Sequence, residues 1–142
     1  MLDFCKKHNT FLIPRAAGTS LAGQVVGNGI VVDISKNLNK ILEVNAEEKW
    51  VRVQAGVVLQ QLNQYLKQYN LLFGPETSTA NRCCIGGMVG NNSCGLHSLV
   101  YGSARDHLLE AKVILADGKQ VLLKQILKEN IVLTKLLVKI FY

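Results

Sequence analysis

Two glycine-rich stretches contain the residues of this chain that are best suited to contact a ligand. The first runs from Pro14 to Gly23 and the second from Ile85 to Gly95. In the first, small residues followed by Thr19 and Ser20 leave successive backbone N–H groups free to converge on an anion such as a pyrophosphate. In the second, four glycines would let a flat, bulky group lie against the main chain. Either stretch alone could be a set of turns, but the pair indicates a ligand site.

Neither stretch matches the common phosphate-binding signatures. The chain has no G-x-x-x-x-G-K-[ST] run, and the segment from Arg15 to Ser20 lacks the three glycines of G-x-G-x-x-G. The sequence therefore calls for a different nucleotide-binding scaffold.

Four further segments, in order with the first two, complete a resemblance to a known family. They are Pro75–Arg82, Tyr101-Gly102, Arg105–His107 and Ala116–Gly118. From about Met1 to about Val121 the chain resembles the FAD-binding domain of PCMH-type flavoproteins, the vanillyl-alcohol-oxidase superfamily. It is most similar to the branch of glycolate oxidase subunits, D-lactate dehydrogenases and D-2-hydroxyglutarate dehydrogenases. The resemblance implies an α+β fold of two α+β subdomains, about 1–72 and about 73–142, with the domain incomplete.

The resemblance also implies which residues contact the cofactor. N–H groups of the first stretch would bind the pyrophosphate of FAD, with the Thr19 and Ser20 hydroxyls as further donors and Arg15 in a positional role. The expected FAD-binding residues are Arg15, Ala16, Ala17, Gly18, Thr19, Ser20, Pro75, Glu76, Ser78, Thr79, Cys84, Gly86, Gly87, Gly90, Asn91 and Gly95.

Two departures from the family pattern bear on this assignment. The family often has glycine at the positions of Ala16 and Ala17, where any positive φ would be strained by a Cβ. Some relatives bind FAD covalently through a histidine in the first glycine loop, and this loop has none. We therefore expect FAD to be bound non-covalently and to be dissociable.

The function that the resemblance implies is that of the FAD-binding portion of an oxidoreductase. Such an enzyme oxidises a D-2-hydroxy acid of the D-lactate, glycolate or D-2-hydroxyglutarate type by hydride transfer to the flavin. We expect no catalytic residue and no metal ligand in this chain, because relatives supply these from a substrate domain that the sequence lacks. An iron–sulfur partner domain or subunit is a further implied partner.

The ends of the sequence lead to a further expectation. Compared with the family, the sequence begins within the first subdomain and stops before a segment that completes the flavin site. We expect the chain alone to bind flavin weakly or not at all and to be inactive. Two alternatives stay open, namely a non-catalytic flavin-binding module that needs a partner chain, and an inactive truncated fragment.

Composition narrows the class of protein. A chain of 142 residues with 49% hydrophobic and 18% charged residues is typical of a folded domain. The net charge of +6 comes from dispersed lysines without interleaved aromatics, so no nucleic-acid partner is expected. There is no long apolar run and no secretory signal, so we expect no transmembrane segment and a cytoplasmic location. The four cysteines lack a paired spacing and are expected to be reduced thiols, with Cys83 and Cys84 as small packing residues.

Hydrophobic periodicity predicts the elements that would position the two stretches. A helix is expected to end within residues 1–9, and an amphipathic helix to span 57–69 with its Leu and Tyr stripe in the core. Strands are expected at 10–13, 30–34, 41–44, 50–54, 108–115 and 121–123. The apolar tail 131–142 is expected to be part of a helix that lacks its neighbours, or else an exposed membrane or partner helix. His97 and His107 are expected to be structural hydrogen-bonding groups.

Overall fold

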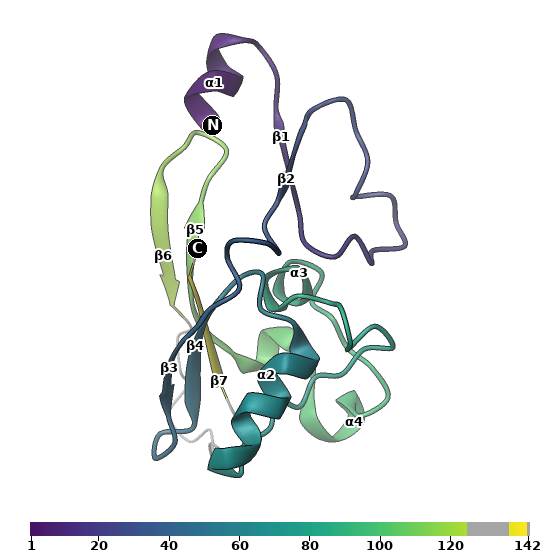
Figure 1. The fold of residues 1–142 in the computed structure, drawn as a ribbon, viewed down its shortest axis with the longest axis vertical. Coiled ribbons are helices and arrows are strands. Elements are labelled where there is room, and N and C mark those ends of the chain that lie inside the picture. Colours follow the sequence, from purple (N-terminus) through teal and green to yellow (C-terminus); the bar gives the residue numbers. More distant parts are fainter. Residues whose placement is uncertain (125–136, 142) are drawn as a thin grey trace.

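The computed structural model describes residues 1–124 and 137–141 (Figure 1). Its elements, in chain order, are α1 (Leu2–Lys7), β1 (Leu12–Arg15), β2 (Ile30–Asp33), β3 (Ile41–Asn45), β4 (Trp50–Gln54), α2 (Leu59–Leu66), the 3₁₀ helix η1 (Lys67–Tyr69), α3 (Ile85–Gly90), α4 (Ser98–Tyr101), the 3₁₀ helix η2 (Ala104–His107), β5 (Leu108–Ile114), β6 (Gln120–Lys124) and β7 (Leu137–Phe141). The predicted mixture of helices and strands is confirmed.

Two sheets organise these elements. Strands β1 and β2 form a parallel pair, and the other five strands form one sheet in the order β3-β4-β7-β5-β6. Both predicted hairpins, β3–β4 and β5–β6, are antiparallel. Helices α2, α3 and α4 lie on one side of the large sheet, and the β1–β2 pair lies beyond α3 (Figure 1). The large sheet contains strands from both sides of residue 72, where we expected the two subdomains to meet.

The C-terminal tail corrects one expectation, because its described part is a strand and not a helix. Strand β7 pairs in parallel with both β4 and β5. Val138 and Ile140 face the core, while Lys139 between them places its Nζ 3.6 Å from the centre of the Trp50 ring. The sequence did not reveal this strand, because the periodicity of a short apolar run does not distinguish a buried strand from a helix. The strands that pair with it are also distant in sequence. Residues 131–136 of the expected helix lie outside the described residues.

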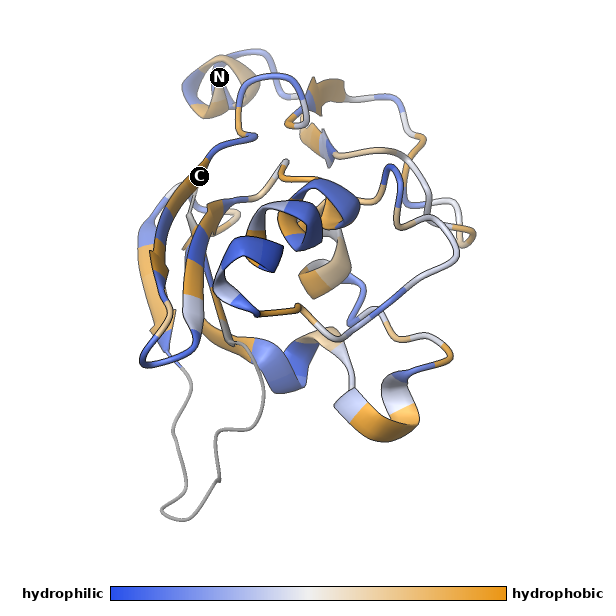
Figure 2. Cartoon of the chain, turned by 60° about the horizontal axis from the view of Figure 1, so that its bottom comes forward, coloured by the Kyte–Doolittle hydropathy of each residue, from blue (hydrophilic) through white to orange (hydrophobic). Residues whose placement is uncertain are grey.

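The core lies between the large sheet and α2. Leu59, Leu62 and Leu66 are buried, as the periodicity predicted. The two tyrosines of the stripe were also expected in the core, but Tyr65 and Tyr69 are 43% and 37% exposed. On a helix these two positions lie at the rim of the leucine face, where the rings cover apolar surface and the hydroxyls reach water. The strands show alternating hydrophobic and hydrophilic bands, as expected for a sheet with distinct faces (Figure 2).

The small sheet carries the first glycine-rich stretch. Strand β1 lies two residues later than predicted and so includes Pro14 and Arg15. Proline is tolerated here because, among the strands of residues 1–124 and 137–141, β1 pairs only with β2. Strand β2 was expected to be buried, but Val31 is 38% exposed because a two-stranded sheet covers only part of its surface. Residues 16–29 form the long connection between these strands (Figure 1).

Candidate functional site

The first loop, residues 16–20, leaves β1 with its backbone N–H groups available. Gly18 has φ +65°, a left-handed conformation that glycine adopts without strain. Within residues 1–124 and 137–141, the N–H groups of Gly18, Thr19 and Ser20 donate no hydrogen bond to the protein. The Arg15 side chain lies beside the loop, since a Cβ on Gly18 would be 3.6 Å from the Arg15 Cδ. Consecutive free N–H groups next to a cation form a concave site suited to an anion.

The two alanines of this loop are not strained. The described non-glycine residues with positive φ are Asn9, Lys49, Asn70 and Asn92. Ala16 and Ala17 are not among them. The family's usual glycine is therefore not required at these two positions for backbone reasons.

The second stretch begins as helix α3 and not as an extended loop. Its start is anchored by two hydrogen bonds, in which the N–H of Ile85 donates to the Val57 carbonyl at 2.9 Å and the N–H of Gly86 donates to the Ala55 carbonyl at 2.8 Å. Gly87 and Gly90 are exposed, and a Cβ on Gly90 would meet nothing within 4 Å. The glycines therefore leave main chain uncovered along one side of α3.

The first loop and the start of α3 meet. A Cβ on Gly87 would lie 3.7 Å from the Cβ of Ala16. Cys84, the residue before α3, is buried, and this burial raises the pKa of its thiol. The charge of Cys83 raises the pKa further, whereas the nearby Ala17 N–H acts in the opposite direction. The structure thus brings the first loop, through Ala16 and Ala17, next to Gly87 and Cys84, which are far from it in sequence.

The segment Pro75–Thr79 follows a different course but is tied to the same region. Thr77 Oγ1 lies 3.2 Å from Thr79 Oγ1 and 3.2 Å from Cys83 Sγ. Pro75 is buried, whereas Glu76 and Ser78 are exposed. On its other side, a Cβ on Gly95 would overlap the Glu76 carbonyl. Glu76, Ser78 and Gly95 therefore form a second group, next to Cys83.

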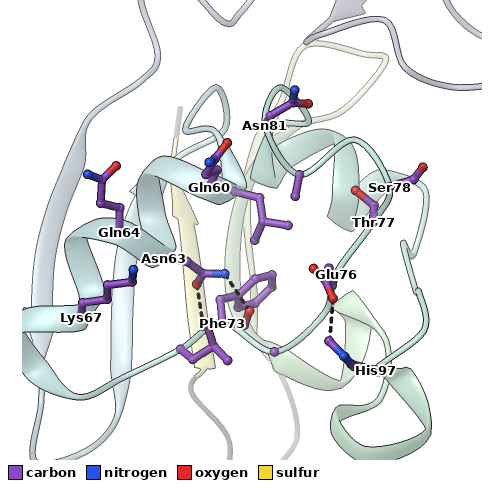
Figure 3. Close-up of a pocket in the computed structure, with 14 residues that line it drawn as sticks. Gln60, Asn63, Gln64, Lys67, Phe73, Glu76, Thr77, Ser78, Asn81 and His97 are labelled. Atoms are coloured by element: carbon purple, nitrogen blue, oxygen red, sulfur yellow. Dashed lines mark hydrogen bonds and ion pairs between the residues drawn. The ribbon is translucent and has the colours of Figure 1, made fainter.

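The cleft of about 850 Å³ in this structure lies between α2 and residues 72–81 (Figure 3). Only Glu76 and Ser78 of the predicted site residues line it. Its α2 wall is made of amide side chains and Lys67, and Asn63 is held by hydrogen bonds to the Phe73 main chain, accepting at 2.9 Å and donating at 3.3 Å. The first loop does not reach the cleft, so the cleft is not where the two glycine-rich stretches meet.

Asn91 is attached to the first group through its main chain. It follows α3 and is exposed, and its N–H donates to the Gly87 carbonyl at 3.0 Å. Gly90 is exposed at the last turn of α3. Both lie farther along α3 than the contact with the first loop.

His97 is a structural hydrogen-bonding group, as expected, and its Nδ1 lies 2.6 Å from Glu76 Oε2, a partner that the sequence did not indicate. Two further residues near the site, Asp33 and Gly56, were not among the expected ones. Asp33 is opposite Arg15 in the β1–β2 register. Hydrogen bonds from the Ser35 side chain and N–H lower the pKa of its carboxyl group, and the charge of Arg15 adds to this. Gly56 lies two residues after β4, and a glycine at that place in a sequence is a signal for close approach of another backbone segment.

The other histidine is a structural hydrogen-bonding group, as predicted. His107 is buried, with its Nε2 2.8 Å from the Tyr101 carbonyl and its ring edge-on to Phe73. Ser103 and Asp106 form a capping box at the start of η2. Cys5, Cys83, Cys84 and Cys94 are all free thiols. His107 therefore has a structural role.

The residues where the loop and α3 meet fit a dinucleotide with a flat ring, because free N–H groups can bind its phosphates and exposed glycines leave room for a planar group against the main chain. A family model described as the FAD binding domain matches residues 1–124. The chain belongs to this family of FAD-binding domains. FAD is the cofactor of this PCMH-type domain, as the resemblance implied.

Curated relatives of this FAD-binding domain are much longer than it. The D-2-hydroxyglutarate dehydrogenase of Escherichia coli (strain K12) is 50% identical over 105 residues, which are 74% of this chain and 10% of the relative. The glycolate oxidase subunit GlcD of Bacillus subtilis (strain 168) is 34% identical over 119 residues, 83% of this chain and 25% of the subunit. The chain thus spans about a tenth of the D-2-hydroxyglutarate dehydrogenases that it matches.

Solved structures share the fold of this FAD-binding domain. An alkyldihydroxyacetonephosphate synthase superposes with a TM-score of 0.75 at 22% identity, covering 88% of this chain and 23% of the synthase. The 6-hydroxy-D-nicotine oxidase of Arthrobacter nicotinovorans also gives 0.75, at 19% identity, covering 87% of this chain and 26% of the oxidase. These likenesses establish the fold, and they extend to nearly the whole domain.

The described residues hold neither a membrane-spanning helix nor a cluster of metal ligands. No helix there is long and apolar enough to span a membrane. In the same part of the chain, no three histidine, cysteine or acidic side chains are grouped so that they could hold a metal ion.

Proposed function

We propose that this FAD-binding domain serves an oxidoreductase that acts on a D-2-hydroxy acid. The observation that carries the proposal is the 50% identity over 105 residues to D-2-hydroxyglutarate dehydrogenase. The matches to a glycolate oxidase subunit and to a D-lactate dehydrogenase support the same class of substrate, a carboxylate with a hydroxyl on the adjacent carbon. The domain is the cofactor-binding part of this activity.

The residues that would hold FAD fall into the two groups described above. The free N–H groups of Gly18, Thr19 and Ser20 would bind the pyrophosphate, with Arg15 beside them as a compensating charge. Gly87 and Gly90 would give the ribityl chain and ring close access to the α3 main chain. The remaining contacts would come from Ala16, Ala17, Pro75, Glu76, Ser78, Thr79, Cys84, Gly86, Asn91 and Gly95.

When bound, FAD supplies the acceptor for the hydride that leaves the hydroxyl-bearing carbon. The chain's own part is to bind and orient the cofactor and to exclude water from one side of it. We assign no catalytic residue to this domain. In the proposed enzyme, a separate substrate domain supplies the groups that contact the hydroxy acid. An iron–sulfur partner domain or subunit, non-covalent attachment of FAD and a cytoplasmic location complete the proposal.

A chimera tests the proposed activity. The 105-residue matching segment of E. coli D-2-hydroxyglutarate dehydrogenase would be replaced by that of this chain, and flavin content and D-2-hydroxyglutarate oxidation would be measured. We expect a flavin-loaded chimera that oxidises the D-enantiomer. A chimera that folds and loads FAD but leaves it oxidised with D-2-hydroxyglutarate, D-lactate and glycolate would contradict the proposed substrate class.

A further inference from the structure

The turn between β4 and α2 contacts both parts of the proposed cofactor site. Its two central residues, Ala55 and Gly56, belong to neither glycine-rich stretch. On one side, the Gly56 N–H donates to the Leu38 carbonyl at 2.7 Å, in the segment that follows β2. On the other, the Ala55 carbonyl accepts the Gly86 N–H at 2.8 Å, at the start of α3. The turn is therefore hydrogen-bonded to two segments that lead to the first loop and to α3.

Both contacts leave no room for a larger residue. A Cβ on Gly56 would lie 2.5 Å from the Ile34 carbonyl oxygen and 2.7 Å from that of Leu38. A Cβ on Gly86 would lie 2.6 Å from the Ala55 Cβ. Real Cβ atoms do not approach backbone this closely, so any added methyl group must push the segments apart. The small size of these residues thus sets the spacing.

These contacts belong to a closed series of contacts between neighbouring segments, called the ring here, that passes through the site. Ile34 donates its N–H to the Arg15 carbonyl at 3.0 Å, directly before the first loop. From there the ring continues through Ala16 to Gly87, whose added Cβ would be 3.7 Å away. Gly86 then returns to the turn at Ala55. A displacement at the turn must therefore change the distance between the first loop and α3.

We propose that Ala55 and Gly56 are positioning residues of the FAD site, which set the separation between the first loop and α3. The proposal rests on the site proposed above and adds two residues that need not touch the cofactor. One FAD molecule must contact the N–H groups of the loop and the glycines of α3 at once, so its affinity depends on their separation. Shifts of a fraction of an ångström in such a constellation are costly.

The test compares FAD affinity with stability in the full chain. Gly56→Ala widens the ring, and Gly118→Ala serves as a matched control, because Gly118 lies at the β5–β6 turn with φ +90° and far from the loop. The FAD dissociation constant would be measured by titration with flavin fluorescence as the signal. The stability of the cofactor-free protein would be measured by denaturant unfolding. We expect Gly56→Ala to raise the FAD dissociation constant about tenfold or more while the protein is folded, and Gly118→Ala to leave it within about twofold.

A second variant covers the possibility that Gly56→Ala does not fold. Ala55→Gly removes the methyl group that contacts Gly86 and cannot create a clash, so it relaxes the ring while keeping both hydrogen bonds. We expect weaker FAD binding and an altered visible circular dichroism of the bound flavin. If the isolated chain binds too weakly to titrate, the same variants in the chimera give the same comparison.

Two outcomes would overturn the inference, and a third would remove its basis. Folded Gly56→Ala and Ala55→Gly proteins that bind FAD as tightly as the wild type would show that the spacing is irrelevant. Equal losses in Gly56→Ala and Gly118→Ala would show that the effect is general destabilisation. Failure of the wild-type sequence to bind FAD in both the chain and the chimera would overturn the proposed site itself.

Discussion

His97 Nδ1 lies 2.6 Å from Glu76 Oε2, and this pair joins the beginning of α4 to the segment that we propose borders FAD. The same two segments meet at Gly95, whose close approach to the Glu76 carbonyl leaves no room for a Cβ. The ring of Tyr101 also packs on Gly74. Residues 74–77 are thus supported along their length by residues 95–101.

Loss of the His97–Glu76 pair should loosen α4 without unfolding the domain. The side chains are 56% and 49% exposed, so a double-mutant cycle with His97→Ala and Glu76→Gln should give a coupling below about 1 kcal/mol. Hydrogen exchange of residues 96–101 should be faster in both single variants. Unchanged exchange there, or a coupling of several kcal/mol, would contradict this account of the pair.

Gly18→Asp should abolish FAD binding, because it places a carboxylate where we propose the pyrophosphate binds. Gly118→Asp is the matched control, with the same charge change at another glycine of positive φ. Both variants should lose roughly 1–3 kcal/mol of stability from backbone strain. Only Gly18→Asp should lose FAD affinity, by about 100-fold or more from like-charge repulsion. Visible absorption after addition of FAD and desalting measures the difference, in the chain or in the chimera.

The thiols should differ in reactivity towards iodoacetamide. Cys94 is exposed and should be alkylated first, whereas Cys5, Cys83 and Cys84 are buried. Burial also raises the pKa of Cys84, which lowers its thiolate fraction at neutral pH. Mass spectrometry of a time course would identify the order. Prolonged alkylation that reaches Cys84 should block FAD binding, because the added group lies against the first loop; rapid modification of Cys84 would contradict the packing described here.

Asp33 should contribute to stability above its ordinary pKa and lose that contribution in acid. Hydrogen bonds from the Ser35 side chain and N–H hold the pKa of Asp33 in the folded state below its ordinary value. The unfolded state therefore binds more protons as the pH falls through this range, and folding is weakened. The pKa of Asp117 is also lowered, chiefly by the hydrogen bond from the Lys119 N–H, so its contribution to stability is lost in acid in the same way.

Denaturant unfolding from about pH 5 downwards tests this linkage. The fall in unfolding free energy should be shallower in Asp33→Asn and in Asp117→Asn than in the wild type. Asp33→Asn should also change FAD affinity, since Asp33 lies opposite Arg15, whereas Asp117→Asn should not. Parallel pH curves for all three proteins would count against the Ser35 hydrogen bonds as the cause.

Strand β7 should matter for stability, in contrast to an unpartnered helical tail. Ile140 is 6% exposed between β4 and β5, so Ile140→Ala should cost about 2–5 kcal/mol. Leu122→Ala, on the edge strand β6 and 48% exposed, is the control and should cost much less. Similar small effects of both substitutions on urea unfolding would show that β7 is not part of the folded sheet.

The local elements and the chemical nature of the site can be inferred from the amino-acid sequence alone. Hydrophobic periodicity and turn residues act between neighbours within a few positions. They are therefore sufficient to predict the hairpins and the leucine face of α2, and the two glycine-rich stretches can be read directly from their composition. The ordered motifs from Pro14 to Gly118 were also sufficient for the family, which the match over residues 1–124 confirmed. The structural role of His107 was also expected from the sequence.

The contacts between distant segments, in contrast, become visible in the folded chain. The pairing of β7 with β4 and β5, the meeting of Ala16 with Gly87, and the ion pair of His97 with Glu76 each join residues that no period relates. Gly56 shows the reason most clearly. Its sequence position marks only the end of a strand, whereas its need to be glycine comes from the Ile34 and Leu38 carbonyls, which the fold brings to its Cα. Close packing is a property of the assembled chain, so the spacing within the site was set there.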